Sequence, residues 1–173
     1  MSAQECVSCG KPKAVLNCDV CQDPVCKKCD QILARDTFSF LPVVPEALSH
    51  MHYCNNCHDS IVAPELEAYD EVMEQAKAVY VFFTTQRKEI PLIRKEREVL
   101  KVKDCDDRDE TILRLAFLSA KQGFNAIIEV EVNAEKVRDG AYQTSRWSGK
   151  GVAAMVDGQK VELQDKRKAM YRY

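Results

Sequence analysis

Four CxxC pairs occupy the first third of the chain and limit what it can fold into. Eight of its nine cysteines form these pairs, which are Cys6/Cys9, Cys18/Cys21, Cys26/Cys29 and Cys54/Cys57. A CxxC pair directs two sulfur atoms at one point, and a structural zinc ion takes four such ligands in a tetrahedron. The pairs therefore predict two zinc sites. Metal binding would also supply folding free energy that residues 1–60, which have few large apolar side chains, otherwise lack.

The spacing alone allows three ways of sharing the pairs between two metals. The two middle pairs, separated only by residues 22–25, can share one metal and leave the outer pairs to the other. Sequential pairing joins the first pair with the second and the third with the fourth. Interleaved pairing joins the first with the third and the second with the fourth.

The order of the pairs resembles the cross-brace zinc finger of the FYVE family. It reads CxxC, eight residues, CxxC, four residues, CxxC, a long loop and CxxC, and the four-residue gap is the most specific part. In that family the sites interleave. The resemblance implies that Cys6, Cys9, Cys26 and Cys29 hold one zinc, and that Cys18, Cys21, Cys54 and Cys57 hold the other. A RING finger is less similar, because the histidine of its third ligand unit is missing.

Two other uses of these residues are less favoured. A dithiol redox centre needs one CxxC on a thioredoxin-like pattern, not four. We expect a cytoplasmic protein, in which clustered cysteines are metal ligands more often than disulfides. His50, His52 and His58 crowd the last pair. Because eight thiolates are sufficient for two zincs, we expect these histidines beside the sites and not as ligands.

The charge of the finger argues against anionic lipids and nucleic acid as partners. FYVE domains that bind phosphatidylinositol 3-phosphate carry an arginine- and histidine-rich motif that is absent here, where QDPVCKKC offers only Lys27 and Lys28. Residues 1–63 hold five basic and seven acidic side chains, and two zinc tetrathiolates bring the net charge to about −6. We therefore expect membrane lipid and nucleic acid to be disfavoured as partners.

A long apolar insert, DQILARDTFSFLPVVPEALSHMHY, separates the third pair from the fourth. It either packs over the zinc core or onto the rest of the protein, or it forms an exposed loop that docks a partner. We favour packing.

The rest of the chain predicts a mixed set of helices and strands. A helix is expected to begin at Pro64 and to connect the finger with the second half of the chain. Strands are expected at 78–84 and 98–105, then a helix over 110–122 with a capping box from Asp107 and Glu110, ended by a left-handed Gly123. The next strand places Phe124, Ala126, Ile128, Val130 and Val132 on one face by alternation. After a turn at 139–140, the last strand covers 141–156.

The strand, helix, strand, strand order over residues 92–157 resembles the small bacterial YbjQ family. The stretches GFNAIIEVEV and WSGKGVAAMV carry this resemblance. The family is labelled as heavy-metal-binding, its fold is akin to the dodecins, and its members assemble through their sheets. The resemblance therefore implies a homo-oligomer.

Together these observations predict an α+β protein with four parts. They are a FYVE-like double zinc finger (1–63), a connecting helix (64–77), a β-α-β-β domain with an antiparallel sheet (78–160) and a basic tail (161–173). Two Zn²⁺ are the expected cofactors, and a protein is the expected partner.

We do not expect the protein to be an enzyme. The sequence has no motif that pairs a nucleophile with a base, no phosphate-binding loop and no motif with paired catalytic carboxylates. Cys105, in acidic surroundings, is a poor nucleophile. Two rival functions remain. One is a membrane adaptor that uses Lys27, Lys28 and the insert, and the other is a ligand-binding or enzymatic site formed between subunits around Trp147.

Overall fold

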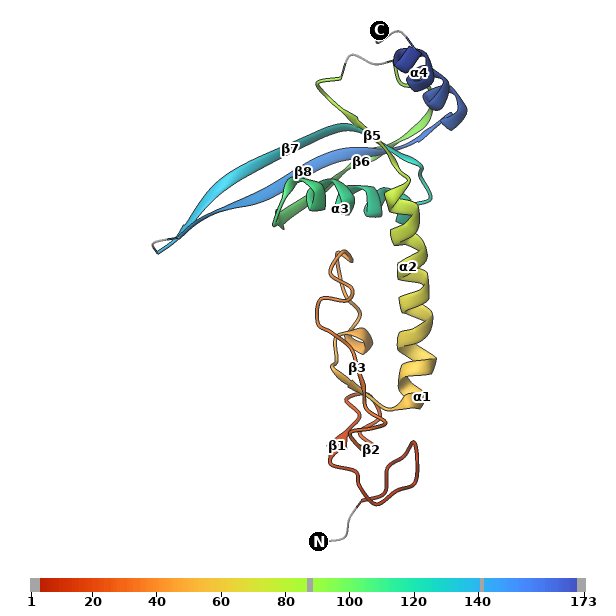
Figure 1. Ribbon diagram of the computed structural model, residues 1–173, viewed down its shortest axis with the longest axis vertical. Coiled ribbons are helices and arrows are strands. Elements are labelled where there is room, and N and C mark those ends of the chain that lie inside the picture. Colours follow the sequence, from red (N-terminus) through yellow and green to blue (C-terminus); the bar gives the residue numbers. More distant parts are fainter. Residues whose placement is uncertain (1–3, 87–88, 141, 171–173) are drawn as a thin grey trace. The chain divides into compact units, whose positions relative to one another are not determined.

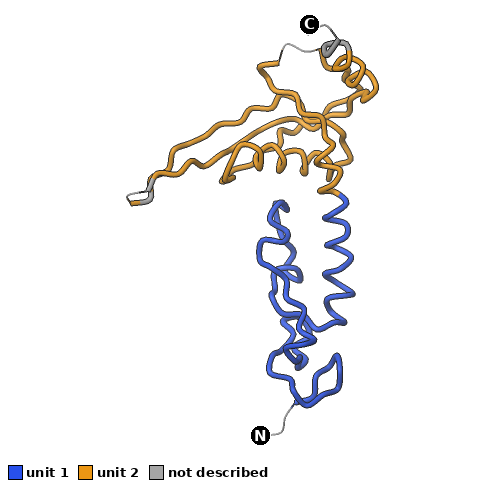
Figure 2. Tube along the Cα trace, viewed as in Figure 1, with its two compact units in different colours: residues 1–71 blue, residues 72–173 orange. Residues whose placement is uncertain are grey.

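The computed structural model describes residues 4–86, 89–140 and 142–170. The chain divides into two compact units, unit 1 (Met1–Glu71) and unit 2 (Val72–Tyr173) (Figure 2). Both small and larger sheets are present together with helices, so the fold is mixed α and β.

Unit 1 has little regular structure besides its last helix. Two tiny antiparallel sheets pair β1 (Leu16–Asn17) with β2 (Pro24–Val25), and β3 (Gln31–Ile32) with β4 (His52–Tyr53). A 3₁₀ turn, η1 (Glu46–Leu48), lies in the insert. One of its two buried clusters consists of four cysteines and Val25. Cysteine sulfur therefore replaces most of the aliphatic side chains that a core of this size would otherwise need.

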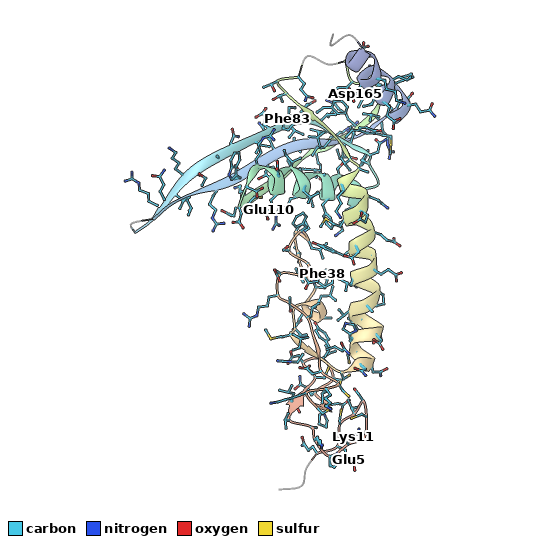
Figure 3. All side chains as sticks on the ribbon, in the orientation of Figure 1. Glu5, Lys11, Phe38, Phe83, Glu110 and Asp165 are labelled. Atoms are coloured by element: carbon cyan, nitrogen blue, oxygen red, sulfur yellow. The ribbon has the colours of Figure 1, made fainter. Side chains whose placement is uncertain are left out.

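The insert packs within unit 1 and does not form an exposed loop. Phe38, which is labelled in Figure 3, is only 2% exposed. Its ring meets that of Tyr69 edge to face, with the centroids 5.2 Å apart. The cluster around it comprises Leu33, Phe38, Leu48, Tyr53 and Val62. Ile32 and Val43 are exceptions, since they are 70% and 80% exposed.

The helical segment after the last cysteine pair starts earlier than predicted. It runs through α1 (Asn55–Cys57), the π-helical turn η2 (His58–Val62) and α2 (Ala63–Lys77) (Figure 1). The prediction that the helix begins at Pro64 is therefore wrong. Proline lacks the N–H that would bond to the carbonyl one turn back, and the turn just before Pro64 adopts the wider π geometry.

Unit 2 is built on a four-stranded sheet with the order β5-β7-β8-β6. Its elements are β5 (Tyr80–Phe83), β6 (Leu92–Cys105), α3 (Arg108–Lys121), β7 (Ala126–Asp139), β8 (Tyr142–Val156) and α4 (Gly158–Met170). The expectation of an antiparallel sheet is wrong for one strand, because β5 pairs in parallel with β7. A parallel pairing needs a long crossover connection, and the segment from Thr84 to Asn125 provides it.

Helix α3 lies along one face of this sheet (Figure 1), and its ends match the sequence signals. Asp107 accepts a hydrogen bond from the Glu110 N–H at 2.7 Å, while the Glu110 carboxylate accepts from the Asp106 N–H at 2.6 Å. Gly123 has a φ of 78°, which favours glycine. The predicted cap and the predicted left-handed glycine are both confirmed.

The alternation predicted for β7 is broken in the middle of the strand. Ala126 and Ile128 pack on one face, with Val161 of α4, whereas Val130 packs on the other face, against Leu115 of α3. The register of β7 against β8 shifts between Ile128 and Glu131, where Glu129 has a φ of 54°. A bulge adds one residue and so turns the subsequent side chains to the opposite face.

The segment expected as a basic tail is helical in its described part. Helix α4 reaches Met170, and Val161 of this helix is buried in the sheet core. The final three residues of the expected tail lie outside the described residues.

Candidate metal centre

The structure gathers the eight paired cysteines into two groups of four. Site 1 consists of Cys6, Cys9, Cys26 and Cys29, and site 2 consists of Cys18, Cys21, Cys54 and Cys57; within each site all sulfur atoms lie within 4.8 Å of one another. Site 1 combines the first and third CxxC pairs, and site 2 combines the second and fourth. This is the interleaved grouping among the three that spacing allowed, and it is compatible with a cross-brace zinc finger.

The sulfur separations match the dimensions of a tetrahedral zinc site. Cys9 Sγ lies 3.9 Å from Cys26 Sγ in site 1, and Cys21 Sγ lies 3.8 Å from Cys54 Sγ in site 2. A zinc–sulfur bond of about 2.3 Å places the sulfurs of a tetrahedron about 3.8 Å apart. A disulfide would need about 2.0 Å instead, and all nine cysteines are free thiols. The donor set and its spacing therefore fit a metal ion in each site.

Both sites lie at the surface of unit 1 with one side buried. Each contains two buried cysteines, one intermediate and one exposed. The exposed members are Cys9 in site 1 and Cys21 in site 2. A metal bound at either site would thus be fixed by the core on one side and accessible on the other.

Backbone N–H groups stabilise the anionic form of some of these sulfurs. In site 1 the Cys26 N–H donates to Cys6 Sγ at 3.4 Å, and this bond is the main reason why the pKa of Cys6 falls to about 6. In site 2 burial acts to raise the pKa of Cys18, but backbone N–H groups of Cys21 and Cys54 lower it to about 7. The turns that position the sulfurs therefore also prepare them to bind a cation.

Two other ligand sulfurs, those of Cys29 and Cys57, favour the protonated form. Hydrogen bonds with the sulfurs of Cys26 and Cys9 raise the pKa of Cys29 to about 12. Burial, followed by the Cys54 sulfur, raises the pKa of Cys57 to about 11. Four thiolates cannot gather this closely without a cation, so each site needs a positive ion to ionise fully.

Asp19 joins the two halves of site 2, and sequence reasoning missed it. Its carboxylate accepts hydrogen bonds from the backbone N–H groups of Met51 at 3.1 Å and of His52 at 2.8 Å. The Asp19 N–H in turn donates to the His52 carbonyl. The His52 N–H is also the main cause that lowers the pKa of Asp19. Asp19 comes directly after Cys18, and no pattern in the sequence marks it as the brace to residues 51 and 52.

The three histidines belong to neither sulfur group among the described residues. His52 Nδ1 lies 2.8 Å from Asp30 Oδ2, and His58 Nδ1 lies 3.3 Å from Asp59 Oδ1. The His50 ring packs beside Tyr53. Each imidazole therefore contacts a neighbour other than a ligand sulfur.

The ninth cysteine, Cys105, is buried at the end of β6 in unit 2. Its side chain is 1% exposed, and burial raises its pKa. Such a thiol is a weak nucleophile. The half-buried Trp147 pairs with Cys105 across β6 and β8, so it belongs to the sheet.

Among the described residues, no helix has the length and apolarity needed to cross a bilayer. Searches of protein-family models, of curated proteins and of solved structures gave no significant match to this chain.

Proposed function

We propose that this chain is a zinc-binding, non-catalytic interaction protein. Unit 1 is a FYVE-like cross-brace finger that binds one zinc ion at each sulfur site and serves as a recognition or scaffold module. Unit 2, similar to the YbjQ family, is an assembly module. The zincs supply positive charge and fixed geometry to the thiolates, and so stabilise the fold.

The observation that carries this proposal is a sulfur–sulfur distance near 3.8 Å in each site. The distance joins Cys9 to Cys26 in site 1 and Cys21 to Cys54 in site 2, and the two sites interleave along the sequence. The composition of the core supports it as well. Four of the eight cysteines are themselves the buried core of their half of unit 1. A buried cluster that consists mainly of metal ligands depends on the metal for its stability, as small zinc domains do.

Zinc is favoured over other metals by the ligands. Four soft thiolates in a tetrahedron bind zinc or iron, and they suit magnesium or calcium poorly. No oxygen ligand from a carboxylate belongs to either group in the described part of the chain. A closed site with four protein ligands leaves no coordination position for a substrate, which argues for a structural role.

Assembly through unit 2 is supported by its hairpin. The outer parts of β7 and β8 extend as an arm from the sheet (Figure 1), and the described side chains of 133–138 and 143–146 are exposed. An isolated two-stranded ribbon is at most marginally stable in water. A second copy that covers this ribbon would stabilise it and would display several fingers together.

X-ray absorption at the zinc edge tests the metal proposal. Protein purified without added zinc should give four sulfur neighbours at about 2.3 Å per zinc and no nitrogen shell. Light scattering on the same sample tests assembly, and a mass equal to one chain at tens of micromolar would overturn that part alone. Phosphoinositide binding or a ligand-dependent thermal shift would instead favour the two rival functions.

A further inference from the structure

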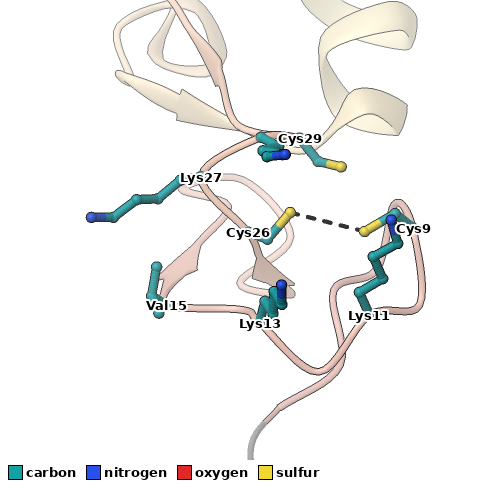
Figure 4. A pocket seen from close by; sticks show the side chains of 8 residues that line it. Cys9, Lys11, Lys13, Val15, Cys26, Lys27 and Cys29 are labelled. Atoms are coloured by element: carbon teal, nitrogen blue, oxygen red, sulfur yellow. Dashed lines mark hydrogen bonds between the residues drawn. The ribbon is translucent and has the colours of Figure 1, made fainter.

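One wall of unit 1 concentrates almost all of its positive charge. Of the five lysine and arginine residues in residues 1–71, four line a single pocket of about 380 Å³ beside site 1. The lining consists of Cys9, Lys11, Lys13, Val15, Cys26, Lys27, Lys28 and Cys29 (Figure 4). Only Arg35 lies outside it. We call this hollow the lysine pocket.

The lysine pocket combines an apolar interior with charged edges. Val15 is an apolar side chain left 63% exposed beside it, and sulfur atoms of site 1 form part of its wall. Figure 4 shows Lys11 beside Cys9 and Lys27 on the opposite side, above Val15. Lysine stems contribute further apolar surface while their ammonium groups stay in water. A ligand that fits this combination has an apolar group flanked by negative charges.

We propose that the lysine pocket binds a short acidic peptide segment of a partner protein, with one apolar or aromatic side chain inserted between carboxylates. Its volume lies within the range of about 300–1,000 Å³ typical of ligand pockets. Four lysines provide a charge of about +4 against about −2 for a zinc tetrathiolate at site 1, so the pocket stays positive when loaded. The proposal rests on the proposed function, because site 1 must be metal-bound for this wall to be formed.

The charge elsewhere in unit 1 favours a peptide over a membrane surface. Residues 1–71 contain eleven acidic side chains against five basic ones. An anionic bilayer is an extended plane and would meet this negative surface as well as the lysines. A peptide meets only the pocket, and charges more than about 8 Å away are screened at physiological salt. Free phosphate would leave Val15 and the apolar wall without a contact.

Fluorescence anisotropy with the full-length, zinc-loaded chain tests the proposal. The probe is a fluorescein-labelled peptide in which one phenylalanine is flanked by glutamates on both sides. Matched peptides replace the glutamates with glutamines or the phenylalanine with serine. Inorganic phosphate and phosphatidylcholine vesicles with phosphatidylinositol 3-phosphate serve as competitors. We expect the parent peptide alone to bind well, and its affinity to fall as salt rises.

Three variants locate the contact. Replacing both Lys11→Gln and Lys27→Gln should weaken peptide binding about tenfold. The control R35Q removes the finger's remaining basic side chain and should change affinity by less than about twofold. V15S should weaken binding of the phenylalanine peptide but not of its serine form. Zinc content is measured for each variant, so that a loss of fold is separated from a loss of contact.

Three outcomes would overturn the proposal. They are a zinc-loaded protein that does not bind the peptide, binding that is equal in the double lysine variant and the parent, and stronger competition by vesicles or phosphate than by unlabelled peptide. A zinc-loaded protein that does not bind the peptide would leave the zinc proposal unaffected. A purified chain that contains no zinc would overturn both the zinc proposal and the peptide proposal.

Discussion

The sulfur atom of Cys21 lies 3.8 Å from that of Cys54, although 33 positions separate the two residues along the chain. Between them in sequence stand Cys26 and Cys29, which belong to the other sulfur group. The chain therefore cannot complete site 2 without passing through site 1. Interleaved sites of this kind couple the folding of the whole finger to both metals.

The first prediction concerns this coupling. C18S and C54S should each abolish zinc binding at site 2 and should destabilise unit 1 to the same extent, because they remove ligands of one ion. Metal content and the cooperativity of thermal unfolding of each purified variant measure this. The matched control is C105S, which removes a buried thiol of unit 2 and should leave the zinc content unchanged. If C18S and C54S differed clearly in zinc content, the interleaved grouping would be contradicted.

Chelation should act on one unit only. One of the two buried clusters of unit 1 is built from its own cysteines, whereas unit 2 has aliphatic clusters on both faces of its sheet. Removal of zinc by a strong chelator should therefore unfold residues 4–62 and leave the sheet of unit 2 folded. Hydrogen exchange followed by mass spectrometry would locate the loss of protection. Equal loss in both units would speak against this account.

The insert should contribute strongly to the stability of unit 1. F38A removes a buried ring that packs on Tyr69 and is expected to cost about 3–5 kcal/mol. V43A, at an exposed position of the same insert, should stay within about 0.5 kcal/mol of the parent. Chemical denaturation of the zinc-loaded protein compares the two variants. A similar, small effect for both would show that the insert does not pack in solution as described.

Close packing of α3 on β8 depends on the absence of a side chain at Gly149. A Cβ there would lie 2.7 Å from Thr111 Cγ2 and 3.0 Å from Leu115 Cδ1, and both of these residues are fully buried. G149A should destabilise unit 2 by about 1–3 kcal/mol through overpacking. S148A, at the adjacent position of the strand, is the control and should have little effect. A stability for G149A equal to the parent would indicate that α3 is farther from β8 than described.

The sequence was most informative where chemistry is local. Four CxxC pairs identified every member of both sulfur groups, and the Asp107 and Glu110 spacing located the start of α3. The grouping of the pairs came only from the resemblance to a cross-brace finger, because spacing left three alternatives. Ligand identity is a property of residue type, whereas grouping depends on long-range chain path.

Features that depend on backbone geometry or on distant partners were missed. The bulge at Glu129 moves the later side chains of β7 to the opposite face of the sheet. The regular apolar alternation of the sequence does not indicate this bulge. The parallel pairing of β5 depends on which edge of the sheet is available to it. Local residue propensities do not predict this. The Asp19 carboxylate binds the backbone N–H groups of Met51 and His52. Because every residue except proline has this N–H group, the residue types at 51 and 52 do not reveal the contact.

Native mass spectrometry of the intact chain, purified without added zinc, tests the central claim most directly. The account predicts two zinc ions per chain, and loss of at least one of them in C18S. A stoichiometry of one or none, or two ions that both persist in C18S, would contradict it.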